Sequence, residues 1–143
     1  MTIDIKDFRI GSIFQPTFIS DRGNRYIPSR VYYKAIEVQS SSIIAVDVSE
    51  KEATEFKCLS LFDVNPISLS GKILLNCGFK KLDHTQIYTF PYSEVDCFTI
   101  QENLSNFKYY EVRYKKTIDS LNKLQNIFYD LTGLELKVKN FNF

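Results

Sequence analysis

The sequence contains no tryptophan, one histidine and three cysteines. It also contains no apolar run of about 20 residues, the length that a bilayer-spanning helix needs. Its start, MTIDIKDF, lacks the basic and apolar regions of a signal peptide. Cys58, Cys77 and Cys97 lack C-x-x-C spacing, which is typical of free thiols in a reducing compartment. We therefore expect a cytoplasmic protein that does not enter the membrane.

Neither sign of charge predominates. Lys and Arg total 18 against 17 Asp and Glu, so the formal net charge is +1 and no global field attracts nucleic acid or an anionic membrane. A local basic patch remains compatible with this balance. The main function is therefore not expected to be nucleic-acid binding.

Catalytic and metal-binding motifs are also missing. The chain has no H-x-x-x-H, C-x-x-C or G-x-x-x-x-G-K-[ST] pattern. His84 lies next to Asp83 and Thr85 in a predicted turn, and the sequence offers no motif that would bring further ligands to it. We predict no metal, no cofactor and no enzymatic activity.

The 143 residues match the usual size of one domain. The patterns predict an α+β fold, with small barrel-like antiparallel strands over residues 1–66. A short helix, a second small antiparallel sheet and a covering C-terminal amphipathic helix follow over residues 67–143.

The C-terminal helix is the clearest element. Thr117 is the expected N-cap, and Gly133 is the expected stop. The alternating residues 134–138 then predict a strand. The apolar stripe of the helix follows three- and four-residue steps and consists of Leu121, Leu124, Phe128 and Leu131.

Other segments are predicted from turn residues and alternation. Residues 16–30 indicate an exposed loop, and residues 49–55 a charged turn. A short helix begins after the cap Ser70 and ends at Gly78. Strands are expected at residues 31–39, 42–48, 56–64, 86–90, 95–101 and 108–116.

Aromatic residues make up 15% of the chain, and several lie near arginines. Guanidinium groups bind phosphate and aromatic faces stack on bases, so such a cluster suits a small anionic ligand, with a nucleotide as the leading example. A plain exposed loop is the alternative interpretation of residues 16–30. The candidate ligand-binding residues are Arg9, Arg22, Arg25, Tyr26, Arg30, Tyr32, Tyr33 and Arg113.

Three segments carry a resemblance to a family. Residues 5–12 (IKDFRIGS), 66–79 (PISLSGKILLNCGF) and 124–136 (LQNIFYDLTGLEL) are similar to the patterns DLRIGN, PIPLTEEILLKCGF and LQNLYFALTGEEL. These patterns occur in uncharacterised small proteins of phages and integrated mobile elements of gut bacteria. The chain departs from them at Gly71 and Lys72, where relatives are acidic, and at Asn122, where many have histidine. The resemblance implies a phage or mobile-element origin and no known reaction.

Two functions are compatible with these patterns. The first is a non-catalytic protein that sequesters a small anionic ligand, such as a cyclic ADP-ribose or cyclic dinucleotide immune signal, to counter host defence. The second is a barrel-type module that interacts with a protein or a nucleic acid. Apolar residues outside the helix stripe, together with Phe141 and Phe143 in the tail, further predict a homo-oligomer, most simply a dimer.

Overall fold

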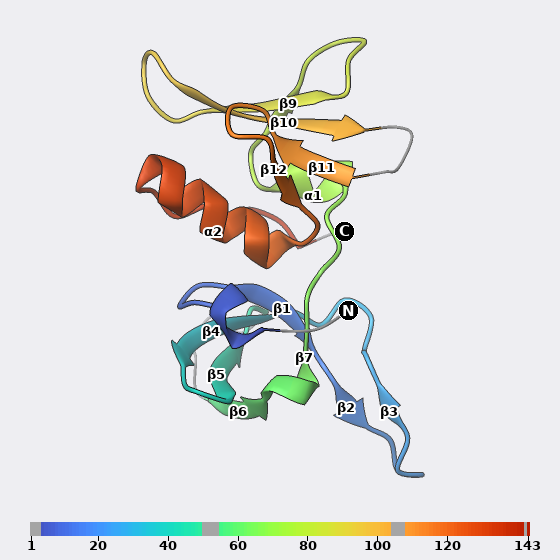
Figure 1. The fold of residues 1–143 in the computed structure, drawn as a ribbon. Coiled ribbons are helices and arrows are strands. Elements are labelled where there is room, and N and C mark those ends of the chain that lie inside the picture. Colours follow the sequence, from blue (N-terminus) through green and yellow to red (C-terminus); the bar gives the residue numbers. More distant parts are fainter. Residues whose placement is uncertain (1–3, 50–54, 104–107, 142) are drawn as a thin grey trace. The chain divides into compact units, whose positions relative to one another are not determined.

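The computed structural model describes residues 4–49, 55–103, 108–141 and 143 (Figure 1). The chain divides into two compact units, Met1–Ile67 and Ser68–Phe143, and each is described by itself. The sequence predicts a change from barrel-like strands to a helix and second sheet between residues 66 and 67, close to this division. Whether the two units act as one domain stays a prediction. The predicted α+β class with antiparallel sheets is confirmed.

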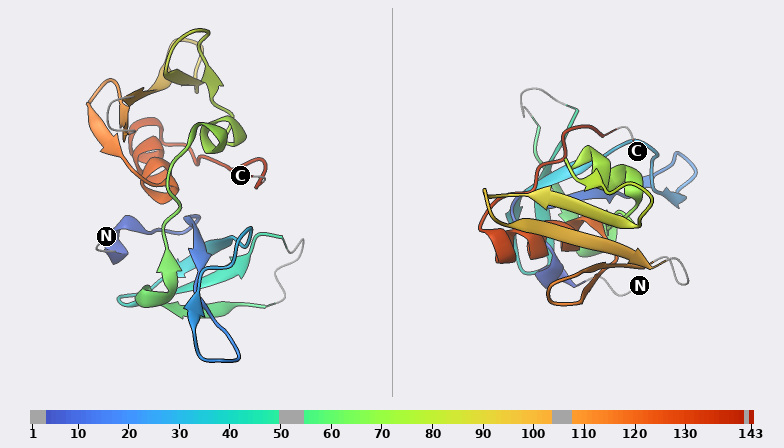
Figure 2. Two further views of the ribbon diagram at one scale, coloured as in Figure 1. Left: turned by 90° about the vertical axis from the view of Figure 1, so that its right-hand side faces the viewer. Right: turned by 90° about the horizontal axis from the view of Figure 1, so that it is seen from above.

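The first unit contains a five-stranded sheet in the order β6-β5-β4-β1-β7, with the hairpin β2–β3 as a separate two-stranded sheet (Figures 1 and 2). Within the described residues the larger sheet is open rather than closed into a barrel. Its predicted central hairpin is confirmed, with a bulge between Ala35 and Glu37. The elements are η1 (Ile5–Asp7), β1 (Ile13–Pro16), β2 (Phe18–Ile19), β3 (Arg25–Tyr26), β4 (Tyr33–Val38), β5 (Ser42–Asp47), β6 (Lys57–Ser60), η2 (Leu61–Asp63) and β7 (Val64–Asn65).

The structure corrects two predictions for the first unit. Residues 16–30 are not a plain loop, because they contain β2 and β3. Residues 56–64 are not one strand, because the 3-10 turn η2 separates β6 from β7. The charged turn predicted at 49–55 falls mostly on residues 50–54, which lie outside the described residues.

Alternating side chains on the sheet form the core of the first unit. Phe14 lies at its centre, with its ring edge-on to the rings of Phe8 and Tyr33 at centroid distances of 6.1 Å each. The buried cluster consists of Phe8, Phe14, Tyr33, Ala35, Ile43, Ala45 and Val64. Edge-on aromatic pairs of this kind are favourable, so they stabilise the sheet of the first unit.

The second unit contains a five-stranded sheet in the order β12-β11-β10-β9-β8. The predicted meander is confirmed, and Ile100 and Ile118 are buried within it. The elements are α1 (Gly71–Asn76), β8 (Lys80–Lys81), β9 (Ile87–Pro91), β10 (Cys97–Asn103), β11 (Lys108–Glu111), β12 (Lys116–Ile118) and α2 (Leu121–Thr132).

The predicted short helix is confirmed as α1, with the Ser70 side chain accepting from the Ile73 backbone N–H at 3.3 Å. Burial, and secondarily the nearby Glu102 carboxylate, raise the pKa of Tyr109 to about 12. The hydroxyl therefore keeps its proton to a higher pH than an ordinary tyrosine, whose pKa is 10.0.

The predicted C-terminal helix is present as α2, but its start was placed too early. Ser120 is the N-cap, and its side chain accepts from the backbone N–H of Lys123 at 3.4 Å. Thr117 instead lies in β12, paired with Tyr110 of β11. Gly133 ends the helix in the left-handed conformation, at φ 74°, as predicted.

The face of α2 that packs on the sheet is the predicted stripe. Leu121 and Leu124 are fully buried, and the ring of Phe128 lies 5.1 Å and 5.2 Å from the rings of Phe90 and Phe98. Leu131 is only half-buried. Burial of these apolar side chains is the main stabilising contribution of the helix.

The segment after α2 is not the strand predicted for residues 134–138. Leu136 is buried, and the Lys139 backbone N–H donates to the Asn76 carbonyl at the end of α1, at 2.8 Å. The rings of Phe141 and Phe143 lie 6.0 Å apart. The tail therefore packs against its own unit as irregular chain.

The strand predicted at 108–116 is two strands. Its centre is a turn in which the Glu111 carboxylate accepts from the backbone N–H groups of Arg113 and Tyr114, at 2.8 Å and 2.7 Å. Lys115 has a positive φ of 54° there. Arg113 and Tyr114 thus lie in a turn rather than in the strand predicted for residues 108–116.

No helix in the described part of the chain is long and apolar enough to span a membrane.

Candidate binding surfaces

The hairpin β2–β3 is shaped by its own turn. The Ser20 carbonyl accepts from the Gly23 N–H at 2.9 Å, and the Ser20 side chain accepts from the Asn24 N–H at 3.1 Å. Gly23 has a φ of 81°, which glycine adopts without the steric cost that a Cβ would bring. This Ser-Asp-Arg-Gly-Asn stretch therefore forms a defined hairpin (Figure 1).

The base of the hairpin is tied to the sheet by two amides. Asn65 Nδ2 donates to the Gln15 carbonyl at 3.1 Å and to Thr17 Oγ1 at 2.8 Å. Gln15 Nε2 donates to the Pro28 carbonyl at 3.3 Å. Both sides of the hairpin are thus linked to β1 and β7, which limits how far the hairpin can swing.

A further link joins the hairpin to η2. The Arg25 guanidinium forms an ion pair with the Asp63 carboxylate and donates to the Phe62 carbonyl at 3.4 Å. Ser60 Oγ contacts the second oxygen of Asp63 at 3.4 Å. A planar guanidinium that bridges two groups restricts both, so Arg25 orients the backbone that carries Phe62.

Phe62 is the most notable side chain of this region because 87% of its surface is exposed. Ile19, the cross-strand partner of Arg25, is 65% exposed and shares the Arg25 face of the hairpin. We call the set Ile19, Arg25, Phe62 and Asp63 the hairpin–η2 surface. It combines two exposed apolar side chains with a guanidinium held in place.

The predicted Arg/Tyr cluster is divided by the alternation of the hairpin. Tyr26 pairs with Phe18, and their rings lie 6.1 Å apart on the face opposite Arg25. Phe18 in turn contacts Tyr33 at a centroid distance of 6.5 Å. Tyr26 therefore packs toward the core side, and Arg25 and Tyr26 do not face one common ligand.

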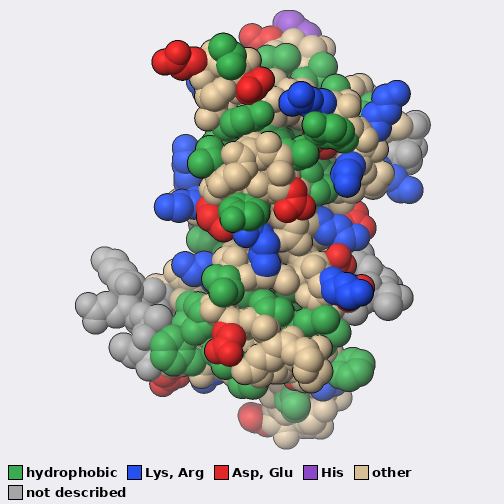
Figure 3. All heavy atoms as spheres, turned by 60° about the vertical axis from the view of Figure 1, so that its left-hand side comes forward, with side chains coloured by type: hydrophobic (Ala, Val, Ile, Leu, Met, Phe, Trp, Pro, Cys, Tyr) green, Lys and Arg blue, Asp and Glu red, His purple; other side chains and the backbone are tan. Residues whose placement is uncertain are grey.

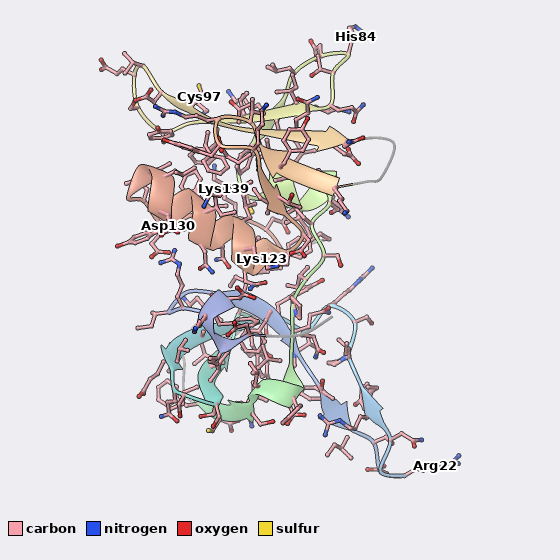
Figure 4. The ribbon with its side chains drawn as sticks, in the orientation of Figure 1. Arg22, His84, Cys97, Lys123, Asp130 and Lys139 are labelled. Atoms are coloured by element: carbon pink, nitrogen blue, oxygen red, sulfur yellow. The ribbon has the colours of Figure 1, made fainter. Side chains whose placement is uncertain are left out.

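The other predicted residues of the first unit are spread apart. Arg22 lies at the outer end of the hairpin and points away from it (Figure 4). Arg30 is exposed at a positive φ of 62°, and Arg9 is half-buried in the turn before β1. Tyr32 and Tyr33 are each only 5% exposed, so they belong to the core.

Arg113 lies in the second unit, at a shallow pocket. The pocket has a volume of about 30 Å³, room for one or two water molecules and far less than a nucleotide needs. The Arg113 guanidinium lies 5.5 Å from the centre of the Tyr114 ring. The pocket is lined by Tyr92, Cys97, Phe98, Glu111, Arg113, Tyr114 and Leu131.

Metal-binding side chains do not gather in the described residues. His84 lies at the outer end of its loop and points outward (Figure 4). Among residues 4–49, 55–103, 108–141 and 143, no three His, Cys, Asp or Glu side chains could share a metal ion. On the face in Figure 3, basic and acidic side chains are interspersed with apolar ones.

Phe62 and Asp63 were missed by the sequence analysis because residues 56–64 were assigned to one strand. The sequence nevertheless contains a signal for the η2 turn. Ser60 and Asp63 have the S-x-x-D spacing that often precedes a helical turn, and Asn65-Pro66 follows directly.

Comparisons with protein-family models, curated proteins and solved structures gave no significant match.

Proposed function

We propose that this protein is a non-enzymatic interaction module that docks against another protein through its hairpin–η2 surface. The observation that carries the proposal is the 87% exposure of Phe62 beside the Arg25–Asp63 ion pair. A phenylalanine so exposed stabilises the free protein little, whereas burial in a partner would contribute on the order of 1.5–3 kcal/mol.

The chemistry of the surface resembles that of interface centres. Exposed aromatic side chains and arginines are enriched among the residues that dominate protein–protein binding. The hairpin is held at its base by Asn65 and Gln15, and Arg25 fixes it to η2. A surface ordered before binding loses less conformational entropy on association, so this arrangement favours affinity.

A protein partner fits better than a nucleic acid. The one cation of the surface, Arg25, is already paired with Asp63, which lowers its attraction for phosphate. Nucleic-acid sites instead gather unpaired Lys and Arg side chains along a groove. The formal net charge of +1 adds no long-range attraction.

The test uses the parent and two matched variants, immobilised and exposed to host-cell lysate. Phe62→Ser removes the proposed anchor, and Val95→Ser removes an equally exposed apolar side chain of the second unit. Mass spectrometry should find a protein retained by the parent and by Val95→Ser but lost from Phe62→Ser. Retention that is identical for all three, or retention only of nuclease-sensitive material, contradicts the proposal.

A second candidate function, capture of a small anionic ligand such as a nucleotide, is favoured by Arg22 and Arg30. Both are exposed, and within the described residues neither forms an ion pair. Their guanidinium groups are therefore available to phosphate. Such capture would suit the anti-defence role and the phage or mobile-element origin that the sequence resemblance implies.

Calorimetry with linear and cyclic ADP-ribose and cyclic dinucleotides tests this candidate. Binding without turnover is expected, with a loss of about tenfold in affinity for Arg22→Ala or Arg30→Ala. Lys34→Ala, at an exposed cation of β4, is the control. Absence of heat from every ligand removes the candidate, and recovery of a cleaved ligand would indicate an enzyme.

Self-association is a separate proposal. The tail contributes less apolar surface than its sequence suggests, since Leu136 is buried and Phe141 contacts Phe143. Exposed apolar side chains such as Leu75 and Leu134 remain available to a second copy. Light scattering at micromolar concentration should give a dimer mass, and a monomer mass contradicts this proposal.

A further inference from the structure

Strand β6 is an open edge of the sheet in the first unit. It pairs with β5 on one side, from Ala45–Lys57 to Ser42–Ser60, and it stands at the end of the strand order. Within the described residues no strand pairs with the other side of β6, so that side is a ready template for another strand.

The pairing register of β5 and β6 identifies which main-chain groups of β6 face its open edge. The Leu61 backbone N–H donates to the Ser41 carbonyl at 3.2 Å, so Leu61 is directed toward β5. In an antiparallel pair this direction alternates with every residue, so Leu59 and Lys57 also bond toward β5. The N–H groups of Cys58 and Ser60 and the Cys58 carbonyl consequently face outward.

Apolar side chains border this edge at both ends. Phe56, directly before β6, is 61% exposed, and Phe62, two residues after β6, is 87% exposed. Between them Leu59 packs against the buried cluster of the sheet. A chain paired with β6 would hydrogen-bond to the main chain of the strand in the middle and contact Phe56 and Phe62 at the two ends. Its apolar side chains would extend the core over Leu59.

We propose that the partner binds by adding an extended segment of its own chain to the open edge of β6, in contact with Phe56 and Phe62. The proposal rests on the proposed function, because Phe62 belongs to both surfaces. Main-chain hydrogen bonds to Cys58 and Ser60 supply affinity, and apolar side chains at alternate positions of the segment supply specificity. The partner class is therefore a protein with an unpaired, extended stretch that alternates apolar and polar residues.

A polypeptide segment fits this edge better than a nucleic acid, because the edge offers peptide donors and acceptors at strand spacing. Lys57, at the start of β6, is paired with Glu55 at 3.4 Å and leaves no unpaired cation on the strand.

Proline at Cys58 gives a selective test. Proline has no N–H, and it is tolerated on edge strands where that N–H would face away from the sheet. Cys58→Pro removes one outward donor and leaves the bonds to β5 in place. Cys58→Ala removes only the thiol and is the matched control.

A random library of peptides of about ten residues is selected on the parent, and the most enriched peptide is measured by fluorescence polarisation. We expect at least about tenfold weaker binding to Cys58→Pro than to the parent, and unchanged binding to Cys58→Ala. Hydrogen exchange on the parent should show that the peptide slows the Cys58 and Ser60 amides. This second measurement does not depend on the stability of the proline variant.

Strand addition is overturned if no peptide is enriched, if a folded Cys58→Pro binds as the parent does, or if the Cys58 and Ser60 amides exchange unchanged. A dimer that Cys58→Pro converts to monomer assigns the edge to a second copy and also overturns the proposal. If Phe62→Ser loses the lysate partner while Cys58→Pro retains it, the proposed function stands and strand addition falls.

Discussion

The guanidinium of Arg25 pairs with the carboxylate of Asp63 and so connects the hairpin to η2, across 38 residues of sequence. The side chains are 53% and 30% exposed, so solvent screens the pair and its contribution to stability is small. The pair mainly positions η2 relative to the hairpin, because the same guanidinium also binds the Phe62 carbonyl. Arg25 therefore contributes to the shape of the surface more than to the fold.

Arg25→Ala should lower the free energy of unfolding by less than about 1 kcal/mol while hydrogen exchange of the hairpin amides becomes faster. Arg25→Lys keeps the charge but loses the planar guanidinium that contacts both Asp63 and the Phe62 carbonyl, so an intermediate exchange rate is expected. Unchanged hairpin exchange in Arg25→Ala would show that the ion pair does not hold the hairpin.

Leu124→Ala and Phe128→Ala should each lower the free energy of unfolding by about 2–5 kcal/mol. Leu124 is fully buried, and Phe128 is 1% exposed between the rings of Phe90 and Phe98. Tyr129→Ala, on the exposed side of the same helix, is the control. Equal thermal midpoints for all four proteins would mean that α2 does not pack on the sheet as described.

Gly71→Ala should destabilise the protein because a Cβ there would lie 2.5 Å from the hydroxyl oxygen of the buried Tyr88. We expect a loss of about 1–3 kcal/mol, typical of overpacking. Tyr88→Phe removes that oxygen and leaves Cζ at 3.4 Å, so the loss should largely disappear in the double variant. Additivity of the two changes within about 0.5 kcal/mol would exclude the steric contact.

The three free thiols should differ in reactivity. Cys58 and Cys97 are exposed, whereas burial raises the pKa of Cys77 from 9.0 to about 12. At about pH 8 a disulfide reagent should modify two thiols per chain without denaturant and the third only on unfolding. Rapid modification of all three thiols in the folded protein would contradict the burial of Cys77.

The same raised pKa predicts a pH dependence of stability. The buried thiol is neutral in the folded state, so its favourable contribution is complete below pH 9.0, the ordinary value, and is lost as pH rises toward about 12. The free energy of unfolding should fall across this window. A flat profile in the parent would count against the shift.

The sequence predicts the elements whose signals are local. The α1 cap at Ser70, the stop at Gly133 and the strands on both sides of residue 40 all follow from residue chemistry within a few positions. Errors arise where tertiary contacts compete with local preference. Thr117 is a good cap residue, yet pairing with Tyr110 places it in a strand and leaves the cap to Ser120.

The candidate site was less predictable for the same reason. Arg25 was identified as a functional candidate, but its partner Asp63 lies far away in sequence, and local reasoning cannot find that pair. Tyr32 and Tyr33 have the composition of a binding strand, and the fold uses both in its interior. Phe62 is exposed because it lies in the η2 turn, whereas the alternating residues 56–64 predict one continuous strand.

The central claim is that Phe62 contacts a protein partner, and site-specific photo-crosslinking tests it most directly. Benzoylphenylalanine is introduced in place of Phe62 in one protein and in place of the equally exposed Val95 in another. After irradiation in cell lysate, we expect a covalent adduct with one partner protein from position 62 and none with that protein from position 95. An adduct from position 95 alone, or the same adducts from both positions, would contradict the claim.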